Sequence, residues 1–242
     1  MMKSFDKFGY EIVNNYVKEF FSSVVKVCKF YAPDFFPEKE YKNLWTDPKF
    51  SQNLIDLRNK ERKKFASIYD TLLKSNLLHI FCYKNKLDNL ASKFLKVKKD
   101  EISVRNLTLR MDVPDDKKNI YGWHQDSAYD NFNLDPKNGI VLWTPLINTN
   151  KRNGTLQVMP GSHVEDNCCY LKKTGGKFGS KQILVEKKYL DKYKSKSVEV
   201  KKNSCLVSLA NLFHASGFNS SKQVRFVFIV RFNKILSKDF IH

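Results

Sequence analysis

The stretch ISVRNLTLR, residues 102–110, marks the point where the pattern of this chain changes. Apolar and polar side chains alternate along it, which is the two-residue period of a strand with one buried face. Downstream, short strand-like segments are separated by turn sequences such as Lys137-Asn138-Gly139 and Pro160-Gly161-Ser162. We expect these further strands at residues 121–126, 140–145, 155–158, 198–200, 205–209 and 224–232.

The residues before position 100 have the apolar spacing of helices instead. In the first segment, large apolar residues recur every three or four positions, which predicts one amphipathic helix from residue 5 to about 31, with its apolar face formed by Phe8, Ile12, Tyr16, Phe20, Val24 and Val27. A second helical pattern begins at Pro48, a residue suited to a first helical turn, and continues to Leu73. Residues 77–95 predict one or two short helices.

Helices followed by short antiparallel strands predict an α+β fold that is mainly β, with a helical layer against a double-sheet core such as a jelly roll. The length suits a single domain, 1–242, with a mostly helical part at 1–100 and the β core at 101–235. An insertion at about 164–202, rich in Lys, Gly and polar residues, interrupts the strands. It lies between the segments around residues 124 and 214, which are candidate parts of a functional site as argued below. We therefore expect it to form a lid rather than a mobile loop.

The chain is strongly basic, since 43 Lys plus Arg against 25 Asp plus Glu give a formal net charge of +18. Only seven of these cations are Arg, and the Lys residues are spread along the whole chain. A nucleic-acid groove is typically indicated by clustered Arg with interleaved aromatic residues, so the diffuse charge favours a solvated surface and disfavours a nucleic-acid partner. A positive field nevertheless draws anions toward a cleft, which favours an anionic small-molecule substrate.

The five cysteines, at positions 28, 82, 168, 169 and 205, are an odd number and form no paired CxxC pattern. This usage is typical of a reducing cytoplasm rather than of a disulfide framework. The N-terminal residues contain no apolar signal core, and no later run is long enough for a membrane span. We therefore expect a cytoplasmic protein without a membrane partner, and the sequence predicts no particular oligomeric state.

Two potential metal ligands lie two residues apart in His124-Gln125-Asp126, so on a strand both side chains would project from one face. His214 is the best candidate for a third ligand, with His163 and His79 as rivals. Two His, one carboxylate and open coordination positions are typical of a non-haem Fe(II) oxygenase site. An HxD pattern arises often by chance, so the tripeptide alone is a weak signal.

Arg225 strengthens the choice of His214. It follows His214 by eleven residues and opens the very apolar run 226–230. A guanidinium on a core strand is costly unless it is paired with an anion. The anion could be the distal carboxylate of a dicarboxylic co-substrate such as 2-oxoglutarate, which the forked donors of Arg would match, or an internal Asp or Glu.

Four motifs, in this order and spacing, resemble the phytanoyl-CoA dioxygenase family. They are Trp123–Tyr129 (WHQDSAY), Val141–Leu146 (VLWTPL), Asn153–His163 (NGTLQVMPGSH) and His214–Ser221 (HASGFNSS) followed by Arg225. The resemblance covers about residues 101–233, and the first hundred residues carry no comparable motif. It implies a double-stranded β-helix, or jelly-roll, core that binds Fe(II) and 2-oxoglutarate and uses O2.

Carried over position by position, the resemblance implies that His124, Asp126 and His214 are the iron ligands and the catalytic centre, and that Arg225 binds the far carboxylate of 2-oxoglutarate. It also makes Ser216 and Trp143 weaker candidates for the same co-substrate pocket. Gln125 and Asn219 match family positions near the metal, with strand and turn scaffolding as their alternative role. Two residues are candidates for substrate contact: Arg110 and Tyr129.

The function predicted from these residues is an Fe(II)- and 2-oxoglutarate-dependent dioxygenase that hydroxylates a small metabolite, with an anionic one favoured. In related halogenases a small residue replaces the carboxylate at the position of Asp126, so its presence favours hydroxylation. One alternative is a non-catalytic metal-binding jelly-roll protein. The other, which the scarcity of clustered Arg disfavours, is a nucleic-acid-associated protein.

Overall fold

The computed structural model describes residues 3–18, 23–38, 40–117, 120–129, 138–166, 168–173 and 181–237. Its helices are α1 (Lys3–Phe8), α2 (Val24–Tyr31), α3 (Pro48–Lys60), α4 (Arg62–Lys74), α5 (Asn76–Lys84), α6 (Leu87–Leu95) and α7 (Lys187–Leu190). Its strands are β1 (Tyr10–Val13), β2 (Ile102–Asp112), β3 (Gly139–Pro145), β4 (Gln157–Val158), β5 (Cys169–Lys173), β6 (Lys181–Val185), β7 (Lys196–Ser197), β8 (Cys205–Leu209), β9 (His214–Ala215) and β10 (Arg225–Lys234).

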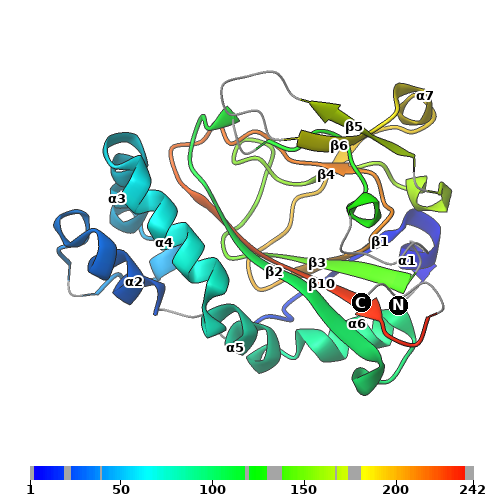
Figure 1. Cartoon of the computed structure of the whole chain (residues 1–242), viewed down its shortest axis with the longest axis horizontal. Coiled ribbons are helices and arrows are strands. Elements are labelled where there is room, and N and C mark those ends of the chain that lie inside the picture. Colours follow the sequence, from blue (N-terminus) through cyan, green and yellow to red (C-terminus); the bar gives the residue numbers. More distant parts are fainter. Residues whose placement is uncertain are drawn as a thin grey trace.

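Two antiparallel sheets and a hairpin form the β core. The larger sheet has the strand order β1-β8-β3-β10-β2, and the smaller sheet has the order β7-β4-β9. Strands β5 and β6 form a separate hairpin that lies above the larger sheet in Figure 1. This mixed α+β architecture with a jelly-roll core confirms the fold class predicted from the sequence.

Strand β10 separates the two hydrophobic cores, because its side chains alternate between its two faces. One face packs against the helical layer through Phe226, Phe228, Val230 and Phe232. The other face turns toward the smaller sheet, where Val227 and Ile229 join a second core. Arg225 and Arg231 have the same parity as Val227 and Ile229, so the strand places both guanidinium groups between the sheets.

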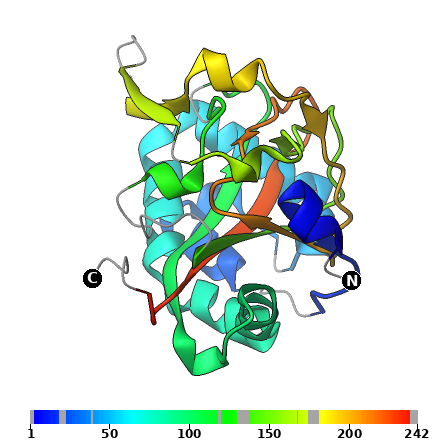
Figure 2. The same cartoon turned by 90° about the vertical axis from the view of Figure 1, so that its right-hand side faces the viewer.

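The helices α3 to α6 cover the outer face of the larger sheet, as Figures 1 and 2 show. Helix α3 begins after Asp47, whose Oδ1 accepts hydrogen bonds from the backbone N–H groups of Lys49 and Phe50. The helical pattern predicted from Pro48 onward is broken at Glu61, which has φ −132° and ψ 60° and separates α3 from α4. Neither Gly nor Pro marks this break in the sequence. Residues 77–95, for which one or two short helices were predicted, form two, α5 and α6.

The single amphipathic helix predicted for residues 5–31 is wrong. Among the described residues of that range, α1 ends at Phe8, and β1 then pairs with β8 at the edge of the larger sheet. Gly9 makes the change of direction with φ +78°, and a Cβ atom there would collide with the imidazole of His163. The apolar spacing of three and four was compatible with a helix, but the edge of the sheet supplied a better partner for this segment.

The insertion at 164–202 contains β5, β6, α7 and β7 in its described part. Residues 174–180, which include Gly175-Gly176, lie outside the described residues, and the role of the insertion as a lid stays a prediction. In the described part of the chain, no helix is long and apolar enough to cross a membrane. All five cysteines are free thiols.

Candidate active site

The three predicted metal ligands converge at one end of a pocket between the sheets. His124 and His214 are joined by two backbone hydrogen bonds, His124 N to His214 O at 3.0 Å and His214 N to His124 O at 3.1 Å. This bridge places the two imidazole rings side by side, with their centroids 4.1 Å apart. Asp126 Oδ1 lies 3.7 Å from Nε2 of His124 and 3.8 Å from Nε2 of His214. The candidate ligand atoms of all three residues lie within 4.8 Å of one another.

The local backbone differs from the strand predicted for residues 121–126. His124 forms only an isolated bridge, and a short 3-10 helix, Asp126–Ala128, begins directly after Gln125. The side chains of His124 and Asp126 still meet, because the turn brings the carboxylate back toward the imidazole. The expected convergence is therefore present, although a turn rather than strand periodicity produces it.

Hydrogen bonds fix the tautomers of both imidazoles. His124 Nδ1 lies 2.8 Å from the carbonyl oxygen of Gly122, and His214 Nδ1 lies 2.9 Å from that of Leu212. A carbonyl oxygen only accepts, so each Nδ1 must be the protonated donor. Both Nε2 atoms then carry a lone pair toward Asp126, which is the arrangement that a metal ion requires.

The protonation states also suit a metal. Burial, followed by the charge of His124, lowers the pKa of His214 to about 4, so this imidazole is neutral at neutral pH. Burial alone would raise the pKa of Asp126, but the charge of Arg231 and the two neighbouring imidazoles lower it below its ordinary value. A neutral imidazole and an ionised carboxylate are the forms that bind divalent metals.

The ligand segment is held from both sides. Gln182 on β6 accepts a hydrogen bond from Gly122 N and donates one to the carbonyl of Ile120. On the other side, Gln125 is fully buried and its side-chain amide donates to the carbonyls of Asn211 and Asp166. These contacts fix the backbone on which His124 and Asp126 are mounted.

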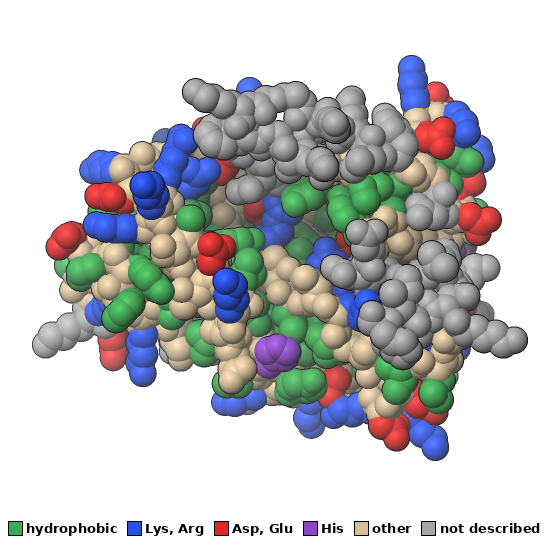
Figure 3. Space-filling model, viewed as in Figure 1, with side chains coloured by type: hydrophobic (Ala, Val, Ile, Leu, Met, Phe, Trp, Pro, Cys, Tyr) green, Lys and Arg blue, Asp and Glu red, His purple; other side chains and the backbone are tan. Residues whose placement is uncertain are grey.

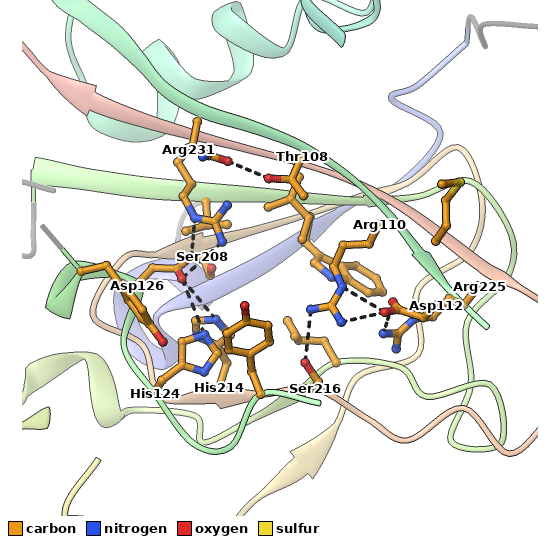
Figure 4. Close-up of a pocket in the computed structure, with 18 of the residues that line it drawn as sticks. Thr108, Arg110, Asp112, His124, Asp126, Ser208, His214, Ser216, Arg225 and Arg231 are labelled. Carbon is orange, nitrogen blue, oxygen red and sulfur yellow. Dashed lines mark hydrogen bonds and ion pairs between the residues drawn. The ribbon is translucent and has the colours of Figure 1, made fainter. Parts of the chain in front are cut away.

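An ion cluster of Arg110, Asp112 and Arg225 lies at the other end of the pocket, as Figure 4 shows. Asp112 Oδ2 accepts from Arg225 Nε at 3.1 Å and Nη2 at 2.6 Å, and Oδ1 accepts from Arg110 Nη2 at 2.7 Å. Burial raises the pKa of Asp112, but the two guanidinium groups outweigh it and hold the pKa below its ordinary value. Two cations and one anion leave this cluster with a net charge of +1.

The pocket between these two groups has a cavity volume of about 330 Å³. In Figure 3, a hollow near the middle of the visible face has basic side chains inside it. Trp143, Ser216 and Tyr129 are among the residues that line the pocket, and their roles toward co-substrate or substrate stay predictions. Ser216 Oγ accepts from Arg110 Nη1 at 3.4 Å, and Arg110 lies over the ring of Tyr121 at 5.6 Å.

Two residues that the resemblance implied near the cofactors are not among the described pocket-lining residues. Gln125 is committed to the backbone contacts described above. Asn219 Nδ2 donates to the carbonyls of Asp112 and Gln223. Their placement favours the scaffolding alternative over direct cofactor contact. The rival histidines also lie elsewhere: His79 is exposed on α5, and His163 is buried in the 3-10 helix Ser162–Val164.

Arg231 is a charged pocket residue that reasoning from the sequence missed. Its Nε donates to Asp126 Oδ2 at 2.9 Å. The available signal was its parity, since Arg231 follows Arg225 by six residues on a strand and therefore shares its face. Nothing in the sequence identifies its partner as a predicted metal ligand.

A jelly roll that brings two His and one carboxylate together beside a buried Arg cluster defines the class of 2-oxoglutarate-dependent non-haem iron enzymes. The sequence model of the phytanoyl-CoA dioxygenase family matches residues 17–227. The chain belongs to this family, and iron, 2-oxoglutarate and O2 are its cofactors. The match includes much of the helical part, for which the sequence offered no motif.

Solved structures of low sequence identity share the fold. EvdO2 from Micromonospora carbonacea var. aurantiaca is 17% identical with a TM-score of 0.56, over 96% of this chain and 89% of that chain. The epimerase SnoN in complex with Fe3+, alpha ketoglutarate and nogalamycin RO is 14% identical with a TM-score of 0.57, over 96% and 81%. EctD from S. alaskensis with 2-oxoglutarate and 5-hydroxyectoine is 15% identical with a TM-score of 0.52, over 96% and 74%. No curated protein sequence matches the chain.

Proposed function

We propose that this protein hydroxylates a small anionic metabolite, with iron held by His124, Asp126 and His214. The observation that carries the proposal is the shared direction of the three ligand atoms: both Nε2 lone pairs and Asp126 Oδ1 face one point between the sheets. When bound, iron and 2-oxoglutarate would activate O2, which is the oxidant: one oxygen atom would enter succinate as 2-oxoglutarate loses CO2, and the other would be inserted into the substrate. The chain supplies the binding, the orientation and the exclusion of water.

The distal carboxylate of 2-oxoglutarate is assigned to Arg225, with Ser216 as a further hydrogen-bond donor. The cluster that contains Arg225 has a net charge of +1 and is largely buried, so one additional carboxylate would balance it. Asp112 already uses the Nε and Nη2 edge of Arg225, which leaves the Nη1 and Nη2 edge to donate to a ligand. The internal salt bridge and the co-substrate contact, which stood as alternatives in the sequence, are therefore compatible.

The substrate would lie between the ion cluster and the metal ligands. Arg110 provides a positive charge on the wall of the pocket, and Tyr129 provides an aromatic surface next to His124, with ring centroids 6.0 Å apart. An anionic group on the substrate would be stabilised by Arg110 and by the positive balance of the cluster. Asp126 keeps a carboxylate at the metal, which supports hydroxylation rather than halogenation.

The first experiment is an anaerobic titration of the protein with Fe(II) and 2-oxoglutarate. We expect a weak visible metal-to-ligand band, and we expect His214→Ala to abolish it because one Nε2 ligand is lost. His79→Ala is the matched control, since His79 is exposed on α5 and outside the pocket. The absence of the band in wild-type protein at saturating reagents would contradict the proposal and favour a non-catalytic metal-binding protein.

The second experiment measures succinate release across a panel of anionic metabolites. A true substrate should increase succinate release and yield a product that has gained one oxygen atom. The relative SnoN is an epimerase. A product of unchanged mass and inverted stereochemistry would therefore show that this enzyme epimerises its substrate rather than hydroxylating it, with the same cofactors.

A further inference from the structure

The carboxylate of Asp126 lies between the imidazoles of His124 and His214 on one side and the guanidinium of Arg231 on the other. Its Oδ1 faces Nε2 of His124 and of His214 at 3.7 and 3.8 Å. Both oxygens also accept hydrogen bonds from Arg231, Oδ2 from Nε at 2.9 Å and Oδ1 from Nη2 at 3.3 Å. Figure 4 shows the guanidinium on the side of Asp126 away from the two imidazoles. Oδ1 therefore faces the two histidines and has the longer hydrogen bond to Arg231, whereas Oδ2 is engaged by Arg231 at the shorter distance.

Strand β10 holds Arg231 firmly in this position. The strand is bonded to β3 on one side and β2 on the other, and Arg231 pairs with Val141 and Asn106. The register with β2 shifts directly after Arg231, which is a β-bulge of the kind often found beside active sites. Asp126 is only 3% exposed, so water cannot readily replace the guanidinium at Oδ2.

We propose that Arg231 is a positioning residue that restricts Asp126 to one metal-binding oxygen. A carboxylate next to a metal ion can bind through one oxygen or both, and an outer hydrogen-bond partner fixes which. With Oδ2 held by Arg231, Asp126 occupies a single coordination position and leaves the others open for co-substrate and O2. This inference rests on the proposed metal site and adds a residue that none of the four family-like motifs contains.

Charge neutralisation is a simpler role for Arg231 and must be distinguished from positioning. Arg231 also neutralises a buried carboxylate, and any cation in its place would do so. Neutralisation alone predicts a change of protein stability and no change in how a bound metal is coordinated. Positioning predicts a change in the ligand field of the metal.

The test uses Co(II) in place of iron in the full chain. Visible absorption and magnetic circular dichroism of Co(II) report its coordination number, and competition with a chelator gives its affinity. In Arg231→Met we expect the affinity to fall about 10- to 100-fold and the Co(II) spectrum to change, because Asp126 is then free to present both oxygens. Arg231→Lys keeps the charge without the forked donors, so we expect a smaller loss of affinity together with a changed spectrum.

Arg225→Met is the matched control, because it removes the same charge from the same face of β10 while its partner is Asp112 rather than a predicted ligand. We expect it to keep the wild-type Co(II) affinity and spectrum. Wild-type affinity and spectrum in folded Arg231→Met or Arg231→Lys, or an equal change in Arg225→Met, would overturn the inference. If Arg231→Met does not fold, Arg231→Lys decides by the same criteria.

The experiment distinguishes failure of the positioning role of Arg231 from failure of the proposed function. Wild-type protein that binds Co(II) and gives the Fe(II)–2-oxoglutarate band, with Arg231 variants that are unchanged, overturns the positioning role alone. Wild-type protein that binds no Co(II) overturns both.

Discussion

Asp112 is the residue on which both arginines at the far end of the pocket depend. Its two oxygens bind Arg110 and Arg225, and it is only 7% exposed. In Asp112→Asn, two partly buried guanidinium groups lose their counter-charge, so we expect the free energy of unfolding to fall by about 3 kcal/mol. Saturating 2-oxoglutarate should recover part of this loss, because its distal carboxylate supplies the missing charge. Urea unfolding with and without 2-oxoglutarate measures both effects.

The control for this prediction is Asp116→Asn, which breaks the pair between Asp116 and Arg58 outside the pocket, 3.0 Å apart. Its destabilisation should not respond to 2-oxoglutarate, and an equal response would contradict the assignment of Arg225.

The pH dependence of stability provides a second check on Asp112. Because the folded-state pKa of Asp112 is lowered, its contribution to stability is complete above the unfolded value of about 3.9 and is lost as the pH falls through the folded pKa. The difference between wild type and Asp112→Asn should therefore shrink in acid.

At the scale of elements, strand β6 supports the metal-ligand segment from outside the sheets. The Gln182 side chain satisfies Gly122 N and the carbonyl of Ile120, and Val185 N donates to the carbonyl of Trp123 at 2.8 Å. In Gln182→Ala we expect the free energy of unfolding to fall by only about 1–2 kcal/mol, because two hydrogen bonds are lost. The Co(II) affinity should fall as well, because the segment preceding His124 is then less constrained.

Gln52→Ala is a suitable control for Gln182→Ala, since it removes one hydrogen bond, to Asp56, from an exposed part of α3. Its Co(II) affinity should equal that of wild type. A Gln182→Ala protein with unchanged metal affinity would show that β5 and β6 pack on the site without positioning it.

The sequence predicted well those helices and strands that pack one face against a single neighbouring layer. Strand β2 was predicted from strict alternation, and α5 and α6 from helical spacing, because each buries one face against a single neighbouring layer. Strand β1 was missed because its identity depends on the open edge of β8, which is some two hundred residues away in the sequence. Tertiary pairing overrides local spacing in such a segment.

The candidate site, like the fold, was predicted only in part from the sequence. His124, Asp126, His214 and Arg225 follow from motif and order, and the structure places all four in one pocket. Arg231 could not be assigned, because its meaning comes from a contact with Asp126 across the fold rather than from a pattern along the chain. The partner of Arg225 was equally hidden, since several Asp and Glu residues were available in the sequence.

At the scale of the whole molecule, four of the seven Arg residues are engaged with acidic partners, whereas Arg62 and Arg152 are exposed. Arg110, Arg225 and Arg231 line the pocket, and Arg58 is paired with Asp116. Figure 3 shows basic side chains dispersed around the visible face rather than gathered into a stripe. Arg residues that are engaged inside the fold cannot contact a phosphate backbone, and 36 of the 43 cations behind the formal net charge of +18 are Lys.

This distribution predicts weak, salt-sensitive binding to DNA. At low salt, a net charge of +18 should give some association with duplex DNA through counterion release. At physiological ionic strength, we expect a dissociation constant no tighter than about 10⁻⁴ M, the weak end of non-specific binding, because dispersed Lys neutralise few phosphates at once. Fluorescence anisotropy of a labelled duplex across a salt series measures this directly. Micromolar affinity that persists at physiological salt would contradict the prediction, and inhibition of succinate release by the same DNA would place the nucleic acid at the pocket itself.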